Sequence, residues 1–133
     1  MHSKRKGNIG SFAIGLELAK LGYSVFTEEG DISKIDIIAE KNGSIIKLQC
    51  KAITPKDDCL TLELQKCGPN YRFKYETGFF DYFAIWDLEN NKAYLIPEKV
   101  LQTHNKAFKI RLISNNNHPC NIASDYELIK MLA

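Results

Sequence analysis

The chain has 133 residues, a formal net charge of +2 and a hydrophobic content of 44%. These values predict one domain over residues 1–133 with a single core, and the charge is too small to indicate a nucleic-acid partner by itself. No segment approaches the ~20 apolar residues of a membrane span, and the basic start lacks the apolar stretch of a signal peptide. We therefore expect an intracellular protein without a membrane partner.

A helix is expected first, over residues 9–21, with Asn8 as its N-cap and Gly22 as its stop. Three basic residues precede it, and they either contact phosphates or form a solvated tail. They are Lys4, Arg5 and Lys6.

Two polar residues of this helix fall on different faces. At about 100° per residue, Ser11 lies on the side that continues the apolar surface. Glu17 lies about 120° away from Ser11, nearest Lys20, at the same helical spacing. We expect a solvent-exposed Glu17–Lys20 pair and a Ser11 that faces the core side.

A strand over residues 23–26 is followed by an acidic segment, residues 28–31, with the sequence Glu-Glu-Gly-Asp. This segment either approaches a metal or forms a solvated turn, and its composition favours the turn. The next two strands, residues 35–40 and 44–52, flank Asn42-Gly43, a pair typical of a tight hairpin.

The hairpin brings a set of polar groups to one sheet edge. Asp36 begins the first strand, and Gln49 and Lys51 share a face at the end of the second, because side chains alternate along a strand. Carboxylate and amide oxygens are hard ligands that suit Mg²⁺. Lys51 is placed to orient an attacking water or to offset charge on a phosphate in the transition state. The edge therefore suits metal-assisted phosphate chemistry, although spacing alone also fits a turn cap and two surface residues.

The four cysteines do not indicate a zinc site. Cys50, Cys59, Cys67 and Cys120 form no C-x₂₋₄-C pair, and no two-histidine motif completes a set of ligands. Cys50 lies on the apolar side of its strand and is interpreted as a small core residue. We expect free thiols.

The remaining elements complete an α/β fold with a central mixed β-sheet flanked by helices. Strands are expected over residues 60–65, 82–87, 93–96 and 108–112, with a short helix from Pro97 to residue 101. Asn115-Asn116-Asn117 is predicted to be a loop, and Ser124 with Glu127 forms a possible capping box before a closing helix.

Two further segments alternate basic and apolar side chains. In the first, Tyr71, Arg72 and Lys74 follow a Gly-Pro-Asn turn, and they supply DNA contacts or form a strand that covers the core. In the second, Lys109 and Arg111 share a strand face. This face either contacts phosphates or belongs to an exposed sheet edge whose charges prevent aggregation. The sequence has no serine-hydrolase elbow, no P-loop and no G-x-G-x-x-G.

An ordered set of motifs resembles the PD-(D/E)XK nuclease superfamily over roughly residues 7–100. The set comprises Lys-Gly-Asn-Ile-Gly opening the helix (residues 6–10), Leu-Gly-Tyr-Ser-Val ending it (21–25), Asp36, Gln49-x-Lys51, and the later strands at 80–84 and 94–97. The Gln-x-Lys variant is similar to the branch that includes group I intron homing endonucleases. The resemblance implies a restriction-endonuclease-like core, with residues 107–133 adding a C-terminal strand and helix.

The same resemblance implies roles for the site. Asp36, Gln49 and the backbone carbonyl of Cys50 would hold Mg²⁺, or Mn²⁺ in its place, and Lys51 would act in catalysis. The branch usually carries a Glu directly after the second helix Gly, where this chain has Ser11. Ser11 is either natural to a site that manages without the acid or a substitution that disables cleavage.

The implied substrate is double-stranded DNA with an extended recognition site. Because cleavage of both strands needs two sites, a homodimer or homotetramer is expected. The alternatives are a restriction-type nuclease, a Holliday-junction resolvase or, from another class, a catalytically silent DNA-binding module.

Overall fold

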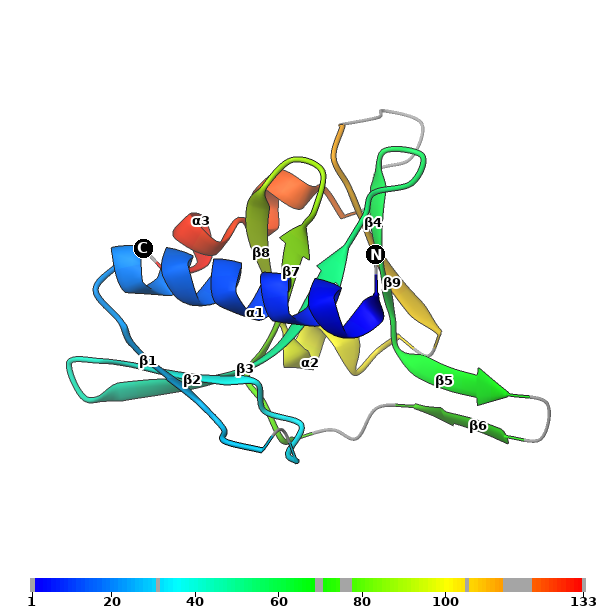
Figure 1. Ribbon diagram of the computed structural model, residues 1–133. Coiled ribbons are helices and arrows are strands. Elements are labelled where there is room, and N and C mark those ends of the chain that lie inside the picture. The colour runs from blue at the N-terminus through cyan, green and yellow to red at the C-terminus, as the bar shows by residue number, and fades with distance from the viewer. Residues whose placement is uncertain are drawn as a thin grey trace.

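The computed structural model describes residues 2–30, 32–68, 71–74, 78–104, 106–113 and 121–132, and the description excludes the side chains of residues 66–68 and 71–74. A mixed β-sheet lies at its centre, with helices packed on it (Figure 1). The predicted α/β class is thereby confirmed.

The first helix, α1, spans Ser3–Lys20 and begins six residues earlier than the sequence predicted. The N-cap is His2, whose Nδ1 accepts the backbone N–H of Lys4 at 3.2 Å, so the assignment of Asn8 as N-cap is wrong. An imidazole is not among the preferred capping groups, which is why its capping role was missed. Lys4, Arg5 and Lys6 consequently belong to the helix and not to a tail.

The predicted stop at Gly22 is confirmed. Its φ of 93° is a left-handed conformation that glycine adopts without strain. The N–H of Gly22 donates to Ala19 at 3.0 Å and that of Tyr23 donates to Leu18 at 3.1 Å. These two bonds form a Schellman motif, which satisfies the last carbonyls of α1 and turns the chain into the first strand.

Five strands form the central sheet in the order β1-β2-β3-β7-β8. Only β3 and β7 are parallel, and the other neighbours are antiparallel, as expected for a mixed sheet. The strands are β1 (Ser24–Thr27), β2 (Ile37–Lys41), β3 (Ser44–Ile53), β7 (Tyr82–Asp87) and β8 (Lys92–Pro97).

The turn between β2 and β3 sets their register. Asn42 and Gly43 have φ values of 53° and 85°, which fits the two-residue hairpin turn that the Asn-Gly pair predicted. This turn pairs Ile37 with Leu48. Leu48 also pairs with Tyr82 of β7. The part of β3 up to Leu48 therefore pairs with β2, and the part from Leu48 onward pairs with β7.

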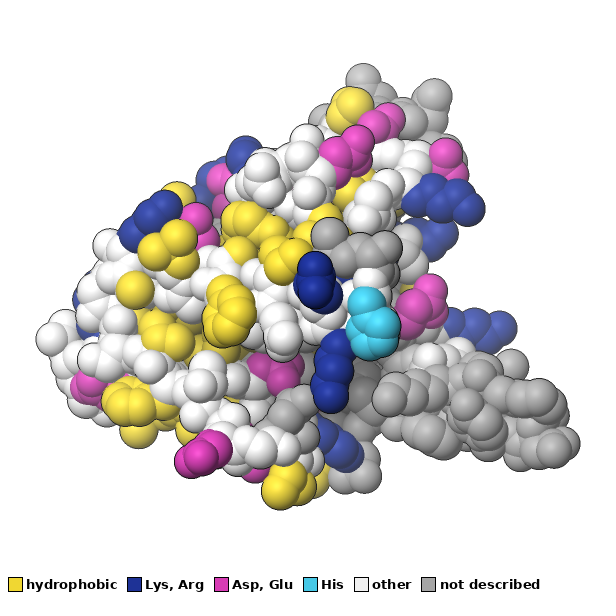
Figure 2. Space-filling model, viewed as in Figure 1, with side chains coloured by type: hydrophobic (Ala, Val, Ile, Leu, Met, Phe, Trp, Pro, Cys, Tyr) yellow, Lys and Arg dark blue, Asp and Glu magenta, His cyan; other side chains and the backbone are white. Residues whose placement is uncertain are grey.

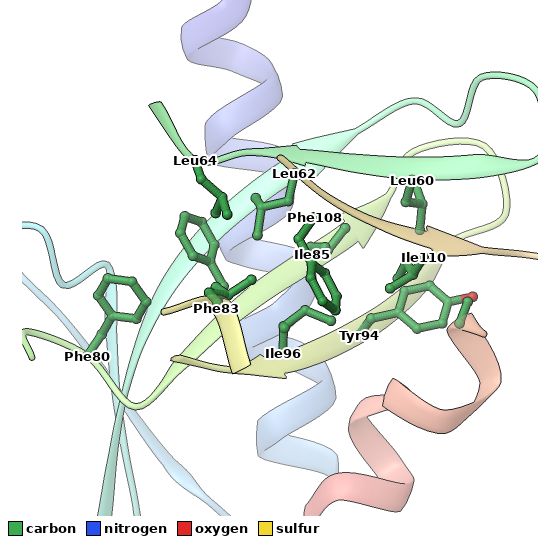
Figure 3. Packing of buried hydrophobic residues seen from close by; sticks show 12 residues of the cluster. Leu60, Leu62, Leu64, Phe80, Phe83, Ile85, Tyr94, Ile96, Phe108 and Ile110 are labelled. Carbon is green, nitrogen blue, oxygen red and sulfur yellow. The ribbon is translucent and has the colours of Figure 1, made fainter. Parts of the chain in front are cut away.

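Two hydrophobic layers enclose the sheet. On one face, Ile14 and Leu18 of α1 pack with Leu48 and with Leu128 of α3 (Leu128–Leu132). On the other face, a second cluster joins the sheet to a two-stranded sheet of β4 (Cys59–Glu63) and β9 (Ala107–Arg111) and to α2 (Glu98–Leu101). Figure 3 shows leucines of β4 pointing at the side chains of β7 and β8 across this second layer.

A separate hairpin is formed by β5 (Gln65–Gly68) and β6 (Tyr71–Lys74). It extends away from the central sheet in Figure 1. The predicted strand over Tyr71, Arg72 and Lys74 is therefore present in the backbone, whereas the positions of their side chains are outside the description.

The C-terminal prediction needs correction. Ser124 lies inside a 3₁₀ helix, η1 (Ala123–Tyr126), and does not cap α3. Glu127 instead forms ion pairs with Lys92 at 3.3 Å and Lys130 at 3.8 Å, which tie the chain end to β8. Pro97 is the N-cap of α2 and precedes its first turn. The predicted loop at residues 115–117 lies outside the described residues.

The described helices and cysteines bear on the membrane and thiol predictions. Within the described ranges, no helix combines the length and apolar character needed to cross a membrane. Cys50 and Cys59 are free thiols. The side chain of Cys67 and the whole of Cys120 lie outside the description.

Candidate functional site

The carboxylate of Asp36 is fixed at the point where β2 and β3 separate. Its backbone N–H donates to the carbonyl of Leu48 at 2.9 Å, which continues the ladder one residue beyond β2. Its Oδ2 accepts the backbone N–H of Cys50 at 2.7 Å. An ionised acceptor makes this bond a strong one. The carboxylate is therefore held against the Gln49-Cys50-Lys51 segment, where the hairpin register predicted it.

The three residues of this segment divide between two faces of the sheet. Leu48 and Cys50 pack on the α1 side. Because side chains alternate, Gln49 and Lys51 project from the opposite face. Gln49 is half-buried and Lys51 is exposed. The predicted grouping of Asp36 with Gln49 and Lys51 is thus consistent with the strand register.

The position of Ser11 depends on a close approach between α1 and β3. A Cβ added at Gly10 would lie 3.0 Å from the Cβ of Ala52, so only glycine lets the helix come this near. Ser11 follows, half-buried, and hydrogen-bonds the side chain of Cys50. Ser11 therefore lies on the α1 side of the same residue whose backbone binds Asp36.

The Cys50 thiol is kept neutral by its surroundings. Burial raises its pKa strongly, the negative charge of Asp36 raises it further, and the hydrogen bond with Ser11 lowers it only in part. A thiolate is the form that binds metals or attacks electrophiles. The Cys50 side chain packs on the α1 side of the sheet, so the group that Cys50 would offer a metal at this site is its backbone carbonyl.

The donor set fits a hard divalent cation with few protein ligands. Asp36 contributes a carboxylate, Gln49 an amide oxygen and Cys50 a carbonyl, and Mg²⁺ accepts such oxygens while it retains several waters. Within the part of the chain that the structure describes, no three His, Cys, Asp or Glu residues converge on a metal position. With a single carboxylate the affinity of such a site is expected to be low.

Glu17 does not supply the missing acid. It forms the predicted pair with Lys20, with 3.6 Å between the charged atoms. In the acidic segment, Glu28 accepts the backbone N–H of Ser33 at 2.8 Å. Hydrogen bonds from Ser33 lower the pKa of Glu28, so this carboxylate is ionised at neutral pH. Glu28 closes a solvent-exposed turn, which is the interpretation that the composition favoured.

The predicted DNA-contacting residues fall on three elements, the start of α1, the strand β6 and the strand β9. Lys4 and Arg5 are exposed and Lys6 is half-buried in the first turns of α1. Figure 2 shows Lys and Arg side chains with one His gathered over this end of α1. Lys109 and Arg111 lie on the outer face of β9, because Phe108 and Ile110 point into the core.

A pocket beside Asp36 was not predicted. It has a volume of about 330 Å³ and is lined by apolar side chains together with Asp36 and Glu28. Its walls come from β1, from the following loop and from β2. All of its lining falls within residues 26–38, but no spacing in this stretch indicates a hollow.

Comparison with known proteins agrees with this geometry. The family model described as PD-(D/E)XK endonuclease matches residues 1–129. The solved structure of a bacterial homing endonuclease, I-Ssp6803I, superposes with a TM-score of 0.78 and 20% sequence identity over 99% of this chain and 93% of that one. A search of curated proteins found no match.

The fold and the sheet-edge site thus define a protein of the restriction-endonuclease-like class. The chain belongs to the PD-(D/E)XK endonuclease family. Family membership bears out the resemblance that the sequence motifs indicated.

Proposed function

We propose that the protein is a divalent-metal-dependent, site-specific DNA endonuclease of the homing type. The observation that carries the proposal is the Asp36 carboxylate bound to the N–H of Cys50 within the Gln49-x-Lys51 segment. The homing role is supported by the structural neighbour I-Ssp6803I, which is a bacterial homing endonuclease.

Each residue of the site would have its own role. Asp36, Gln49 and the carbonyl of Cys50 would hold Mg²⁺ or Mn²⁺, which supplies Lewis-acid chemistry and an acidified water when bound. Lys51, exposed on the same sheet face as Gln49, would orient the attacking water or offset negative charge on the phosphate. The side chain of Cys50 would take no part, because it packs on the α1 side of the sheet.

The start of α1 supports duplex DNA as the substrate. Lys4, Arg5 and Lys6 occupy the first turns, where the helix dipole makes positive side chains unfavourable by about 0.3–1 kcal/mol each. Their presence costs helix stability and fits instead a role in phosphate binding. The same role for Arg72, Lys74, Lys109 and Arg111 is part of the proposal.

Two strands of a duplex require two such sites. A homodimer or homotetramer would supply them and would also cover an extended recognition sequence. A restriction-type nuclease or a Holliday-junction resolvase is the nearest alternative activity. A silent DNA-binding module is favoured by one observation, the hydroxyl of Ser11 where the family branch usually has a carboxylate.

The test compares the chain carrying Ser11 with Ser11→Glu and Ser11→Gln on plasmid DNA, random-sequence duplexes and four-way junctions, with Mg²⁺, Mn²⁺ or EDTA. A second carboxylate beside Asp36 should raise metal-dependent duplex cleavage by about 100-fold or more, whereas the uncharged Gln should not. Cleavage confined to junctions would identify a resolvase. Binding of DNA without cleavage by any form would identify a silent module.

A further inference from the structure

The pocket beside Asp36 opens on the sheet face opposite α1. On β1, Val25 lies against Gly15 of the helix, with 3.5 Å to a Cβ built on that glycine, so the next side chain, Phe26, points away from α1. On β2, Ile37 and Ala39 are buried beneath α1, so Ile38 also points away. Phe26 and Ile38 pair across the strands and form an apolar wall of the pocket.

This wall is accessible from solvent. The side chain of Phe26 is 56% exposed although it lies on the sheet. The pocket volume of about 330 Å³ lies at the lower end of the range of about 300–1,000 Å³ for small-molecule sites. A single planar ring system fits such a volume better than a larger ligand.

The polar lining restricts the chemistry of the occupant. Asp36 and Glu28 both line the pocket, and the lowered pKa of Glu28 keeps it negatively charged. Two carboxylates repel a phosphate and accept N–H donors. An uncharged ring with amino groups is therefore favoured, and an aromatic wall stabilises such a ring by stacking.

Residues 33 and 34 are anchored by contacts with Glu28 and Phe79. Ser33 donates its backbone N–H to Glu28 at 2.8 Å, and its hydroxyl donates to the carbonyl of Ile35 at 3.2 Å. The ammonium of Lys34 lies 4.9 Å from the ring centre of Phe79, which joins the loop to the segment before β7. These contacts hold residues 33–35 beside Glu28 at the rim of the pocket.

We propose that this pocket binds a nucleobase, that of a nucleotide beside the phosphate that Asp36 serves, with Phe26 as the stacking residue. The assignment rests on the proposed nuclease function, because Asp36 forms the boundary between the pocket and the cleavage site. A base in this position would have to leave its stack, which a protein aromatic group and an apolar wall make less costly. The pocket would then contribute to the choice of the cut position.

The experiment is a titration of the full chain with deoxycytidine, followed by backbone amide NMR shifts. Deoxycytidine carries an amino donor for the carboxylates and no phosphate, and 2-deoxyribose is the control without a base. We expect deoxycytidine alone to shift the amides of Thr27, Ser33 and Ile38. Phe26→Leu should weaken its affinity at least about fivefold, whereas Phe26→Tyr should retain it, because stacking needs an aromatic ring.

Phe12→Leu is the matched control, because Phe12 is 75% exposed on α1, away from the pocket. It should bind deoxycytidine as the unsubstituted chain does. Equal shifts with the base-free sugar, or equal affinity in Phe26→Leu, would overturn the proposal. DNA cleavage by a protein that fails this titration would leave the nuclease function intact and remove the base pocket alone.

Discussion

At the scale of single residues, the site is organised around the backbone of Cys50. Its N–H binds Asp36, and its side chain contacts Ser11 of α1. The proximity of Asp36, Gln49 and Lys51 could be predicted from the sequence because a two-residue turn fixes the register of the hairpin. The sequence could place Ser11 only on the core-facing side of α1. Its contact with Cys50 could not be predicted, since that contact depends on how closely α1 approaches β3.

Lys51 is expected to act on the reaction and not on the fold. In a form that cleaves DNA, Lys51→Ala should lower the cleavage rate by about 100-fold or more, because a positive charge at the reacting phosphate is lost. Thermal unfolding should be unchanged within error, since the side chain is exposed. Lys47→Ala removes an exposed lysine from the same face of the same strand and is the control. A comparable loss of rate in both variants would assign Lys51 to general DNA attraction.

Cys50 should resist thiol reagents in the folded protein. Burial and the neighbouring Asp36 raise its pKa, so the folded thiol is protonated at pH 8. An unfolded thiol has a pKa of about 8.5 and is partly ionised at the same pH. Alkylation at pH 8, followed by peptide mass spectrometry, should modify Cys50 much faster in denaturant than in buffer. Rapid alkylation in buffer would show that the Ser11–Cys50 contact opens readily.

At the scale of elements, the strands were more predictable than the helix ends. The alternation of β3 and the apolar run of β7 determine which faces are buried, and both faces of β7 contribute to the core. The start of α1 was missed because its N-cap is a histidine. The capping box predicted for the closing helix was wrong, because Ser124 lies in a 3₁₀ helix and the Glu127 carboxylate pairs with Lys92 and Lys130. Caps depend on local hydrogen bonds that several residue types can supply.

Two glycines of α1 give opposite predictions. Gly10→Ala would place a Cβ 3.0 Å from that of Ala52 and 3.4 Å from its backbone nitrogen, so helix and strand must separate. We expect unfolding free energy to fall by about 1–3 kcal/mol. Gly7→Ala meets nothing within 4 Å and should raise it by about 0.5–1 kcal/mol. Denaturant unfolding measures both, and a stabilised Gly10→Ala would show that α1 is not seated closely on β3.

At the scale of the whole molecule, two hydrophobic layers cover one sheet, and the candidate site lies where β2 and β3 separate. The α1 layer and the β4–β9 layer bury opposite faces of β7, whereas β2 and β3 separate at Leu48. The ordered motifs predicted the family, whose model matches residues 1–129. The β5–β6 hairpin carries none of these motifs, and the pocket at Phe26 depends on how β1, the following loop and β2 pack against one another.

The most direct measurement is the DNA cleavage rate of Ser11→Glu with and without the further substitution Asp36→Asn. Asn keeps an oxygen acceptor for the N–H of Cys50 and removes only the charge. With Mg²⁺ or Mn²⁺, we expect the double variant to cleave at least about 1,000-fold more slowly while it binds DNA equally well. Equal cleavage by both proteins would contradict the proposed site, because the reaction would then not depend on the carboxylate of Asp36.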